Sequence, residues 1–216
     1  MKKFLSALAM TLIMSTTSYA AQGDITLSTV GAKSKEISVT QALQQRKSDR
    51  DFIDKDLKPA QLSKILWAAN GINRPNGKRV NPTALGIYSV EVYAVTREGI
   101  YFYDHANHKL DLIAEGDYRA LTTTEQQFPI KAAVNLIYVE TPDAWYSSKI
   151  IPSREDQTSL AYVAVGAMVQ SVALIAETEG LGNCVRGSIN IDEFKKVAKL
   201  SDEKKFLLAQ SVGKCK

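Results

Sequence analysis

The feature that most constrains the fold is one long stretch whose apolar residues recur at helical spacing on several faces. It runs from about Arg154 to Glu179. One helical face carries Leu160, Val163, Ala164, Ala167, Met168, Ser171, Leu174 and Ile175, and the other faces carry Ala161, Val165 and Val172. A helix that is apolar most of the way round is buried. The sequence therefore predicts a long buried central helix around which the rest of the chain packs.

Shorter periodic stretches define the fold class. Pro59 suits the first turn of a helix, and Gly71 is expected to end that helix as a left-handed cap. The run 132–140 is almost continuously apolar, as in a strand covered on both faces. Strands are predicted at 87–95, 100–103, 110–113, 132–140 and 206–212, and helices at 38–45, 59–71, 115–127, 154–179 and from Asp192. This mixture predicts an α+β fold in a single domain at 38–216.

The first 20 residues have the pattern of an export signal. A basic start precedes an apolar run, and Ser18-Tyr19-Ala20 supplies small residues for cleavage after Ala20. The apolar run is too short to span a bilayer comfortably. We therefore expect a signal peptide at 1–20, with an uncleaved N-terminal anchor as the alternative. The mature chain would be periplasmic or secreted, without a stable membrane span, and would begin with an extended N-terminal arm at 21–37.

Charge and cysteine usage narrow the class of function. Loss of the leader removes two lysines and lowers the formal net charge from +4 to +2, which argues against a nucleic-acid partner. His105 and His108 are expected to be exposed loop residues, and no Cys or His spacing indicates a metal site. The only cysteines are Cys184 and Cys215, and a pair in an exported chain favours a disulfide.

A short cationic motif follows the first predicted helix. Arg46, Ser48 and Arg50 alternate along the chain, so in an extended segment their side chains share one face. Guanidinium groups match phosphate oxygens through two parallel hydrogen bonds. The motif can therefore hold an anion, although a solvated basic surface is the alternative.

The sequence lacks a motif for catalysis by its own side chains. The glycines at 180, 182 and 187 follow a helix and have the wrong spacing for a dinucleotide fingerprint. A Ser elbow and a Gly-rich lysine loop are also missing from the sequence. A bound cofactor is the better account of any enzyme activity.

Four motifs, taken in order, resemble those of the FMN-dependent nitroreductase superfamily, and most closely its branch of SagB-type oxidoreductases. They are Arg46-x-Ser48-x-Arg50-x-Phe52, the helix at 62–69, Pro82-Thr83-Ala84, and the Gly-Leu-Gly stretch at 180–182. The resemblance covers roughly residues 40–213. It implies a sandwich with a mixed, largely antiparallel sheet covered by helices. It also implies a homodimer with FMN at the interface.

The resemblance assigns binding roles and leaves the chemistry to the flavin, so that no side chain is expected to be catalytic. It implies that Arg46 and Ser48 hold the FMN phosphate and ribityl chain, and that Arg50 lies near the pyrimidine edge. The segment from Gly182 to Gly187 would bring a backbone amide near flavin N5. The full implied cofactor-binding set is Arg46, Ser48, Arg50, Pro82, Thr83, Ala84, Tyr88, Gly182, Arg186, Gly187 and Lys214.

Several of these assignments keep an alternative. Thr83 and Tyr88 are equally compatible with ordinary loop and strand packing. Arg186 is unusual for the family and is either an extra anion contact or a surface residue. Lys214 is either a phosphate partner or part of a solvated tail. The resemblance also places the strands of Cys184 and Cys215 side by side, which predicts a disulfide between them.

The implied function is an exported FMN-dependent oxidoreductase with ping-pong hydride transfer through flavin N5 to or from a small organic substrate. NADH and NADPH, the family's usual donors, are scarce outside the cytoplasm, so another electron donor is also considered. One alternative is a SagB-like flavin dehydrogenase or oxidase that passes electrons to oxygen or a partner. Another is a non-catalytic flavin-binding protein. The loop at 141–153 is expected to act as a lid over the flavin.

Overall fold

A computed structural model describes residues 23–31 and 37–216. The predicted signal peptide and part of the predicted arm lie outside these residues. The described strands form one sheet in the order β1-β4-β3-β2-β5-β7-β6, and each neighbouring pair is antiparallel. The strands are β1 (Ile25–Thr26), β2 (Val90–Val95), β3 (Gly99–Asp104), β4 (Lys109–Glu115), β5 (Val134–Glu140), β6 (Gly182–Arg186) and β7 (Lys205–Gly213).

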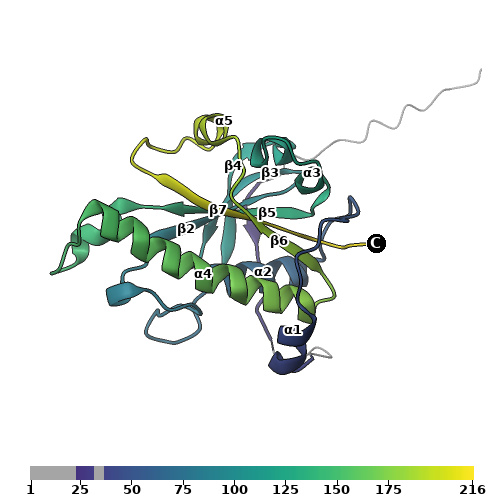
Figure 1. The fold of residues 1–216 in the computed structure, drawn as a ribbon, viewed down its shortest axis with the longest axis horizontal. Coiled ribbons are helices and arrows are strands. Elements are labelled where there is room, and N and C mark those ends of the chain that lie inside the picture. Colours follow the sequence, from purple (N-terminus) through teal and green to yellow (C-terminus); the bar gives the residue numbers. More distant parts are fainter. Residues whose placement is uncertain (1–22, 32–36) are drawn as a thin grey trace, which may run out of the picture.

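Helices cover both faces of this sheet, and α2 and α4 lie together on one of them (Figure 1). The predicted α+β class is confirmed. The α-helices are α1 (Val39–Gln45), α2 (Pro59–Asn70), α3 (Phe128–Lys131), α4 (Arg154–Thr178) and α5 (Ile191–Val197). The 3₁₀ helices are η1 (Ala84–Gly86), η2 (Arg119–Thr122) and η3 (Pro142–Ser147).

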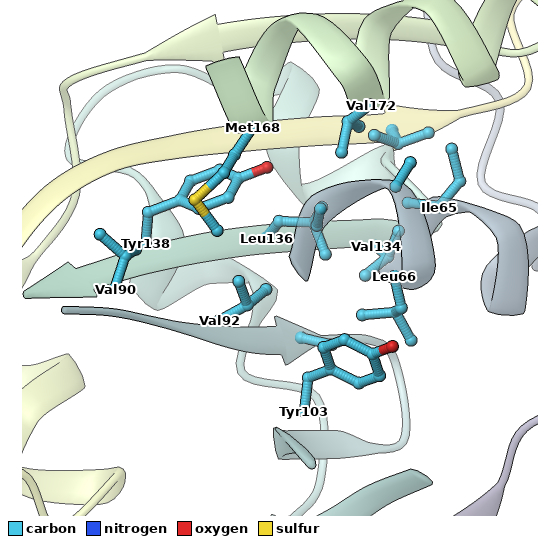
Figure 2. Close-up of a cluster of buried hydrophobic side chains, with 14 of the residues drawn as sticks. Ile65, Leu66, Val90, Val92, Tyr103, Val134, Leu136, Tyr138, Met168 and Val172 are labelled. Carbon is cyan, nitrogen blue, oxygen red and sulfur yellow. The ribbon is translucent and has the colours of Figure 1, made fainter. Parts of the chain in front are cut away.

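The main core lies between the sheet and the helices α2 and α4. Figure 2 shows side chains from these three layers meeting, with Leu136 and Tyr138 from β5, Ile65 and Leu66 from α2, and Met168 and Val172 from α4. Each such side chain stabilises the fold by roughly 1.5–3 kcal/mol when it leaves water. On the opposite face, Phe194 of α5 packs against a second cluster. All seven residues of β5 are buried, which confirms the strand predicted at 132–140.

Helix α4 is the long helix that the apolar pattern predicts, and it buries one face against the sheet. Its outer face remains open in the single chain: Val163 is 72% exposed, Tyr162 is 42% exposed, and Gly166 is also exposed. Among the described helices, α4 alone has the length and composition to cross a membrane. The packing of α4 on the sheet explains why its inner face is apolar. It does not explain why the exposed outer face, with Tyr162 and Val163, is apolar as well.

The ends of the first two helices follow from local sequence. Ser38 caps α1 in a reciprocal capping box with Gln41. Pro59 begins α2 as predicted, but Gly71 does not adopt a left-handed conformation (φ −75°). Glycine is needed at this position for a different reason, because a Cβ atom would collide with the Trp67 side chain.

The helix predicted at 115–127 is wrong. Strand β4 continues to Glu115, and the following residues form η2 and a loop. An ion-pair cluster around the buried Arg119 determines this path. The Arg119 guanidinium lies 2.7 Å from both Asp117 and Asp54 and also donates to the Ala132 carbonyl at 3.2 Å. These long-range partners hold η2 against the segment that follows Phe52.

We expect Asp117→Asn to destabilise the protein by about 2 kcal/mol at pH 7, because the buried Arg119 would lose a charged partner. Burial acts to raise the pKa of Asp117, but hydrogen bonds and charge from Arg119 outweigh it and lower the pKa overall. A carboxyl group with a lowered pKa in the folded state stabilises the fold at pH values above its unfolded pKa, near 4. That contribution disappears as the pH falls below 4. Urea unfolding should therefore show a smaller deficit for the variant at pH 3 than at pH 7, and an equal deficit would contradict this role.

The two histidines are not exposed loop residues as predicted. Arg79 lies 2.9 Å from His105 Nε2, and His108 bridges Tyr103 and Ser63, each at 2.8 Å. Burial is the main cause that lowers the pKa of both imidazoles. Both histidines therefore serve the packing of the β3–β4 turn. The described residues contain no cluster of His, Cys, Asp or Glu side chains that could hold a metal ion.

Candidate functional site

The Arg46–Phe52 segment is held in place by its backbone. The Asp49 N–H donates to the Asn183 carbonyl of β6 at 2.8 Å, and Phe52 forms a β-bridge with Cys215. The Ile53 N–H donates to the Lys214 carbonyl at 2.9 Å. The segment therefore joins the edge of the sheet, and the C-terminal tail is paired with it rather than frayed.

The guanidinium groups of this segment are available to a ligand. The sequence has eight arginines, and in the described structure six of them donate side-chain hydrogen bonds within the chain. Arg46 and Arg50 are the exceptions among the described residues, and Arg50 only lies over the Phe128 ring at 5.8 Å. The exposed Ser48 stands between them. A rigid backbone with two uncommitted cations is well suited to bind an anion such as a phosphate.

The loop carrying Pro82, Thr83 and Ala84 is a second, separately built unit. The Thr83 hydroxyl donates to the Ile87 carbonyl and closes the turn around η1. Before it, the buried Asn81 amide donates to the carbonyls of Ala68 and Ala69 at 2.7 and 2.9 Å. Sequence reasoning missed Asn81, whose role depends on contacts with the distant helix α2.

Tyr88 holds this loop together and also lines the small recess beside it. Its hydroxyl accepts a hydrogen bond from the Arg79 N–H at 2.9 Å, and the Arg79 guanidinium lies 4.4 Å from the centre of its ring. Burial lowers the pKa of Arg79 to about 10. This value is still well above 7, so the guanidinium is charged at neutral pH. The ordinary packing role that the sequence left open for Tyr88 matches this geometry.

Within one chain, the Arg46–Phe52 segment (the cationic segment) and the Pro82–Ala84 loop lie apart. Pro82 and Thr83 line a small recess with Ala164 and Met168 of α4, and neither Arg46 nor Arg50 lines it. Met168 precedes the last residue of α4 by ten positions, or about 15 Å along the helix. The cationic segment instead pairs with β6, which begins after α4 ends. Figure 1 likewise shows α1, which leads into the segment, beside the C-terminal end of α4.

The two glycines assigned to the site have different surroundings. A Cβ atom on Gly182 would collide with the Cys215 sulfur and approach Asp49 Cβ to 2.8 Å. Gly182 therefore allows the cationic segment and the tail to pack against β6. Gly187 is exposed, and a Cβ atom there would meet nothing within 4 Å. Of the two, only Gly187 leaves open space beside the backbone.

Arg186 is neither a surface residue nor an available anion contact. It is 7% exposed, and its five N–H donors are all used by uncharged acceptors. Burial lowers its pKa to about 10. Its side chain fastens η2 to the sheet from inside. The acceptors are the Thr122 carbonyl and hydroxyl, the Ser188 carbonyl, the Asn135 amide oxygen and the Ser211 hydroxyl.

The predicted disulfide is not formed, and both cysteines are free. The strand register explains this outcome. Cys184 lies opposite Ser211 on β7, four residues before Cys215, which is about 13 Å along an extended chain. A disulfide requires Cα atoms about 4.4–6.8 Å apart. Burial is the main cause that raises the pKa of both thiols, which keeps them protonated at neutral pH.

The loop predicted as a lid, 141–153, has its two ends joined by side-chain hydrogen bonds between Glu140 before it and the start of α4 after it. Arg154 donates to the fully buried carboxylate of Glu140, and Thr158 donates to the other oxygen at 3.0 Å. Inside the loop, Trp145 is buried as an anchor while Tyr146 is exposed. The loop therefore has fixed ends and presents an apolar outer surface.

Comparison with known proteins agrees with this architecture. Residues 43–214 match the model of the nitroreductase family. A protein of Methanocaldococcus jannaschii assigned to the nitroreductases is 28% identical over 189 residues, which are 83% of this chain and 92% of that protein.

Two solved structures have a similar fold. A crystal structure from Ralstonia eutropha JMP134, also assigned to the nitroreductases, has a TM-score of 0.81 and 27% identity, covering 100% of this chain and 96% of that one. A protein of Desulfovibrio desulfuricans solved in complex with FMN has a TM-score of 0.55 and 21% identity, covering 83% and 87% of the two chains. The second of these shows the fold alone.

The fold and the match to known nitroreductases define the class of protein, a flavin-dependent oxidoreductase. The match at 43–214 then specifies the family: the chain belongs to the nitroreductase family.

Proposed function

We propose that this protein is an exported FMN-dependent oxidoreductase that transfers hydride in a ping-pong reaction to or from a small organic substrate. The observation that carries the proposal is the pair of uncommitted guanidiniums on a rigid backbone, Arg46 and Arg50, in a family of flavin enzymes. The FMN complex of the Desulfovibrio desulfuricans protein supports the choice of flavin. The leader pattern at 1–20 supports export.

The residues present fit an FMN phosphate. Arg46 and Ser48 would bind the phosphate and the adjoining chain, because their donors are not used inside the protein. Arg50 would place a positive charge near the flavin ring, where it favours the reduced, anionic form. FMN would supply hydride transfer at its N5 atom, and the protein would supply position, charge and exclusion of water.

We further propose that a homodimer completes the site. The cationic segment and the Pro82–Ala84 loop lie apart in one chain, so a second copy is needed to place one beside the other. The outer face of α4 supplies an apolar surface through Tyr162 and Val163, and the neighbouring helix α1 adds the exposed Val39 and Leu43. Exposed apolar patches on the surface of a folded chain mark interaction sites.

The choice of electron donor divides two versions of the proposal. Donor and acceptor bind in turn on the same flavin face in both versions. NAD(P)H serves as donor in the first version. In the second, a SagB-like dehydrogenase oxidises a substrate and passes the electrons to oxygen or a partner protein, which suits a compartment poor in nicotinamide nucleotides.

The absorption spectrum of the purified mature protein tests the proposal. We expect flavin absorbance as isolated or after incubation with FMN, and its loss upon anaerobic addition of NADH. Hydrogen peroxide formation from a candidate substrate without nicotinamide would instead favour the dehydrogenase version. Bound flavin that no donor reduces would identify a non-catalytic flavin-binding protein. Failure to bind FMN at all would overturn the proposal.

A further inference from the structure

A separate cavity lies away from the cationic segment and the Pro82–Ala84 loop. It has a volume of about 260 Å³, is partly open to solvent, and is bounded by the N-terminal arm, the start of α2 and one end of the sheet. Its apolar lining includes Leu27 from the arm, Leu57 and Leu62 from α2 and the segment before it, and Val134 from β5. This volume is just below the range of about 300–1,000 Å³ that suits drug-sized ligands. The cavity therefore suits a small, largely apolar molecule.

The polar groups of the cavity are acidic. Glu98 and Asp56 line it, and no basic side chain does. Asp56 is compensated by Arg97, which lies 3.5 Å away. Glu98 has no cationic partner among the described residues, and its carboxylate only accepts a hydrogen bond from the Thr96 hydroxyl at 2.7 Å. Glu98 thus leaves an uncompensated negative charge beside an apolar surface.

Tyr101 adds an unused polar atom near this end of the sheet. It is fully buried, and its hydroxyl has no hydrogen-bond partner among the described residues. It belongs to the same core cluster as Leu27 and Val134, which line the cavity. A Cβ atom on Gly99 would lie 3.2 Å from its ring, so the ring lies beside the β2–β3 turn. Burial, together with the charges of Glu98 and Glu115, raises the pKa of Tyr101 to about 12.

We propose that this cavity binds a small apolar amine in its ammonium form. The ammonium group donates to the Glu98 carboxylate, and the hydrocarbon part fills the space between Leu57, Leu62 and Val134. A charge-assisted hydrogen bond beside an apolar wall gives both affinity and selection for a cation. None of the residues proposed to hold FMN lines the cavity, so this is a second site with its own ligand.

Benzylamine is the probe that tests the site, with benzyl alcohol and benzoate as uncharged and anionic counterparts. Calorimetric titration of the mature, flavin-loaded protein at pH 7 should show saturable binding of benzylamine. Benzyl alcohol should bind about tenfold more weakly, since the ion-assisted hydrogen bond is lost, and benzoate should not bind. Equal affinities for benzylamine and benzyl alcohol, or no saturable binding of benzylamine, would overturn the proposal.

Three variants locate the binding. Glu98→Gln keeps the shape of the side chain and should lower benzylamine affinity to the level of benzyl alcohol. Leu62→Trp fills the partly open cavity and should abolish binding of both. Glu115→Gln makes the same chemical change outside the cavity and should leave the affinity within about twofold. Unchanged affinity in Glu98→Gln or Leu62→Trp would overturn the proposal, and the flavin spectrum of each variant reports independently on folding and on the flavin site.

Discussion

Arg46→Ala is expected to lower FMN affinity about 100-fold, with little change in the stability of the flavin-free protein. A guanidinium that binds a phosphate through two charge-assisted hydrogen bonds contributes about 3 kcal/mol, which corresponds to that factor. The stability is expected to hold because the Arg46 side chain makes no hydrogen bond or ion pair within the described residues. Fluorescence titration with FMN measures the affinity, and urea unfolding of the apoprotein measures the stability.

Two matched variants sharpen this test. Arg74→Ala removes a guanidinium that only serves its own loop, where it binds Asn73 and the Arg79 carbonyl, and should leave FMN affinity unchanged. Arg50→Ala should weaken binding and also lower the reduction potential of bound flavin, because a positive charge near the ring favours its reduced form. Wild-type affinity in Arg46→Ala would show that the cationic segment is not the phosphate site.

The second large effect is expected for Val163→Asp. This side chain is 72% exposed in the single chain, so a carboxylate there costs a monomer almost nothing. In a symmetric dimer built on α4, each copy would bury a charge in an apolar interface at a cost of several kcal/mol. We expect a rise of at least about 100-fold in the dimer dissociation constant. Because the two halves of the flavin site lie apart in one chain, FMN should be lost at the same time.

Analytical ultracentrifugation and flavin absorbance at equal protein concentration measure these two quantities. Ile191→Asp is the control, since it places the same charge on an exposed apolar residue of α5, away from α4. It should remain dimeric and yellow. A monomeric Val163→Asp protein that keeps its flavin would show that one chain suffices for binding. A dimeric Val163→Asp protein would place the interface elsewhere.

Much of the fold could be predicted because the decisive signals are local. The periodicity of α4, the continuous apolar run of β5 and the proline at the start of α2 each act within one element, and all three elements form as predicted. The burial of α4 is less complete than its apolar pattern predicts, because Val163 on its outer face is 72% exposed in the single chain. The helix predicted at 115–127 failed because non-local contacts decide that region. Arg119 finds its partners at Asp54 and at the Ala132 carbonyl, which local propensity does not report.

Individual site residues were harder to assign than the site segments. Arg186 has the side chain of a typical anion contact, yet five uncharged acceptors on four residues enclose it. Gly182 was expected to make room for flavin, and it makes room for Asp49 and Cys215. For both residues the sequence indicated a close contact with another group. The contacting groups belong to distant segments of the chain, so only the tertiary structure identifies them.

The sequence by itself determined the α+β class, the long apolar helix and the cationic motif of Arg46, Ser48 and Arg50, because these depend on periodicity and on side-chain chemistry within short segments. Only the tertiary structure decided which guanidiniums remain uncommitted, which cysteines can meet, and how far the motif lies from the Pro82–Ala84 loop. These properties depend on strand register and on contacts between distant segments. An arginine's chemistry is the same in the core and at an edge, and its partners decide whether it holds the fold or faces a ligand.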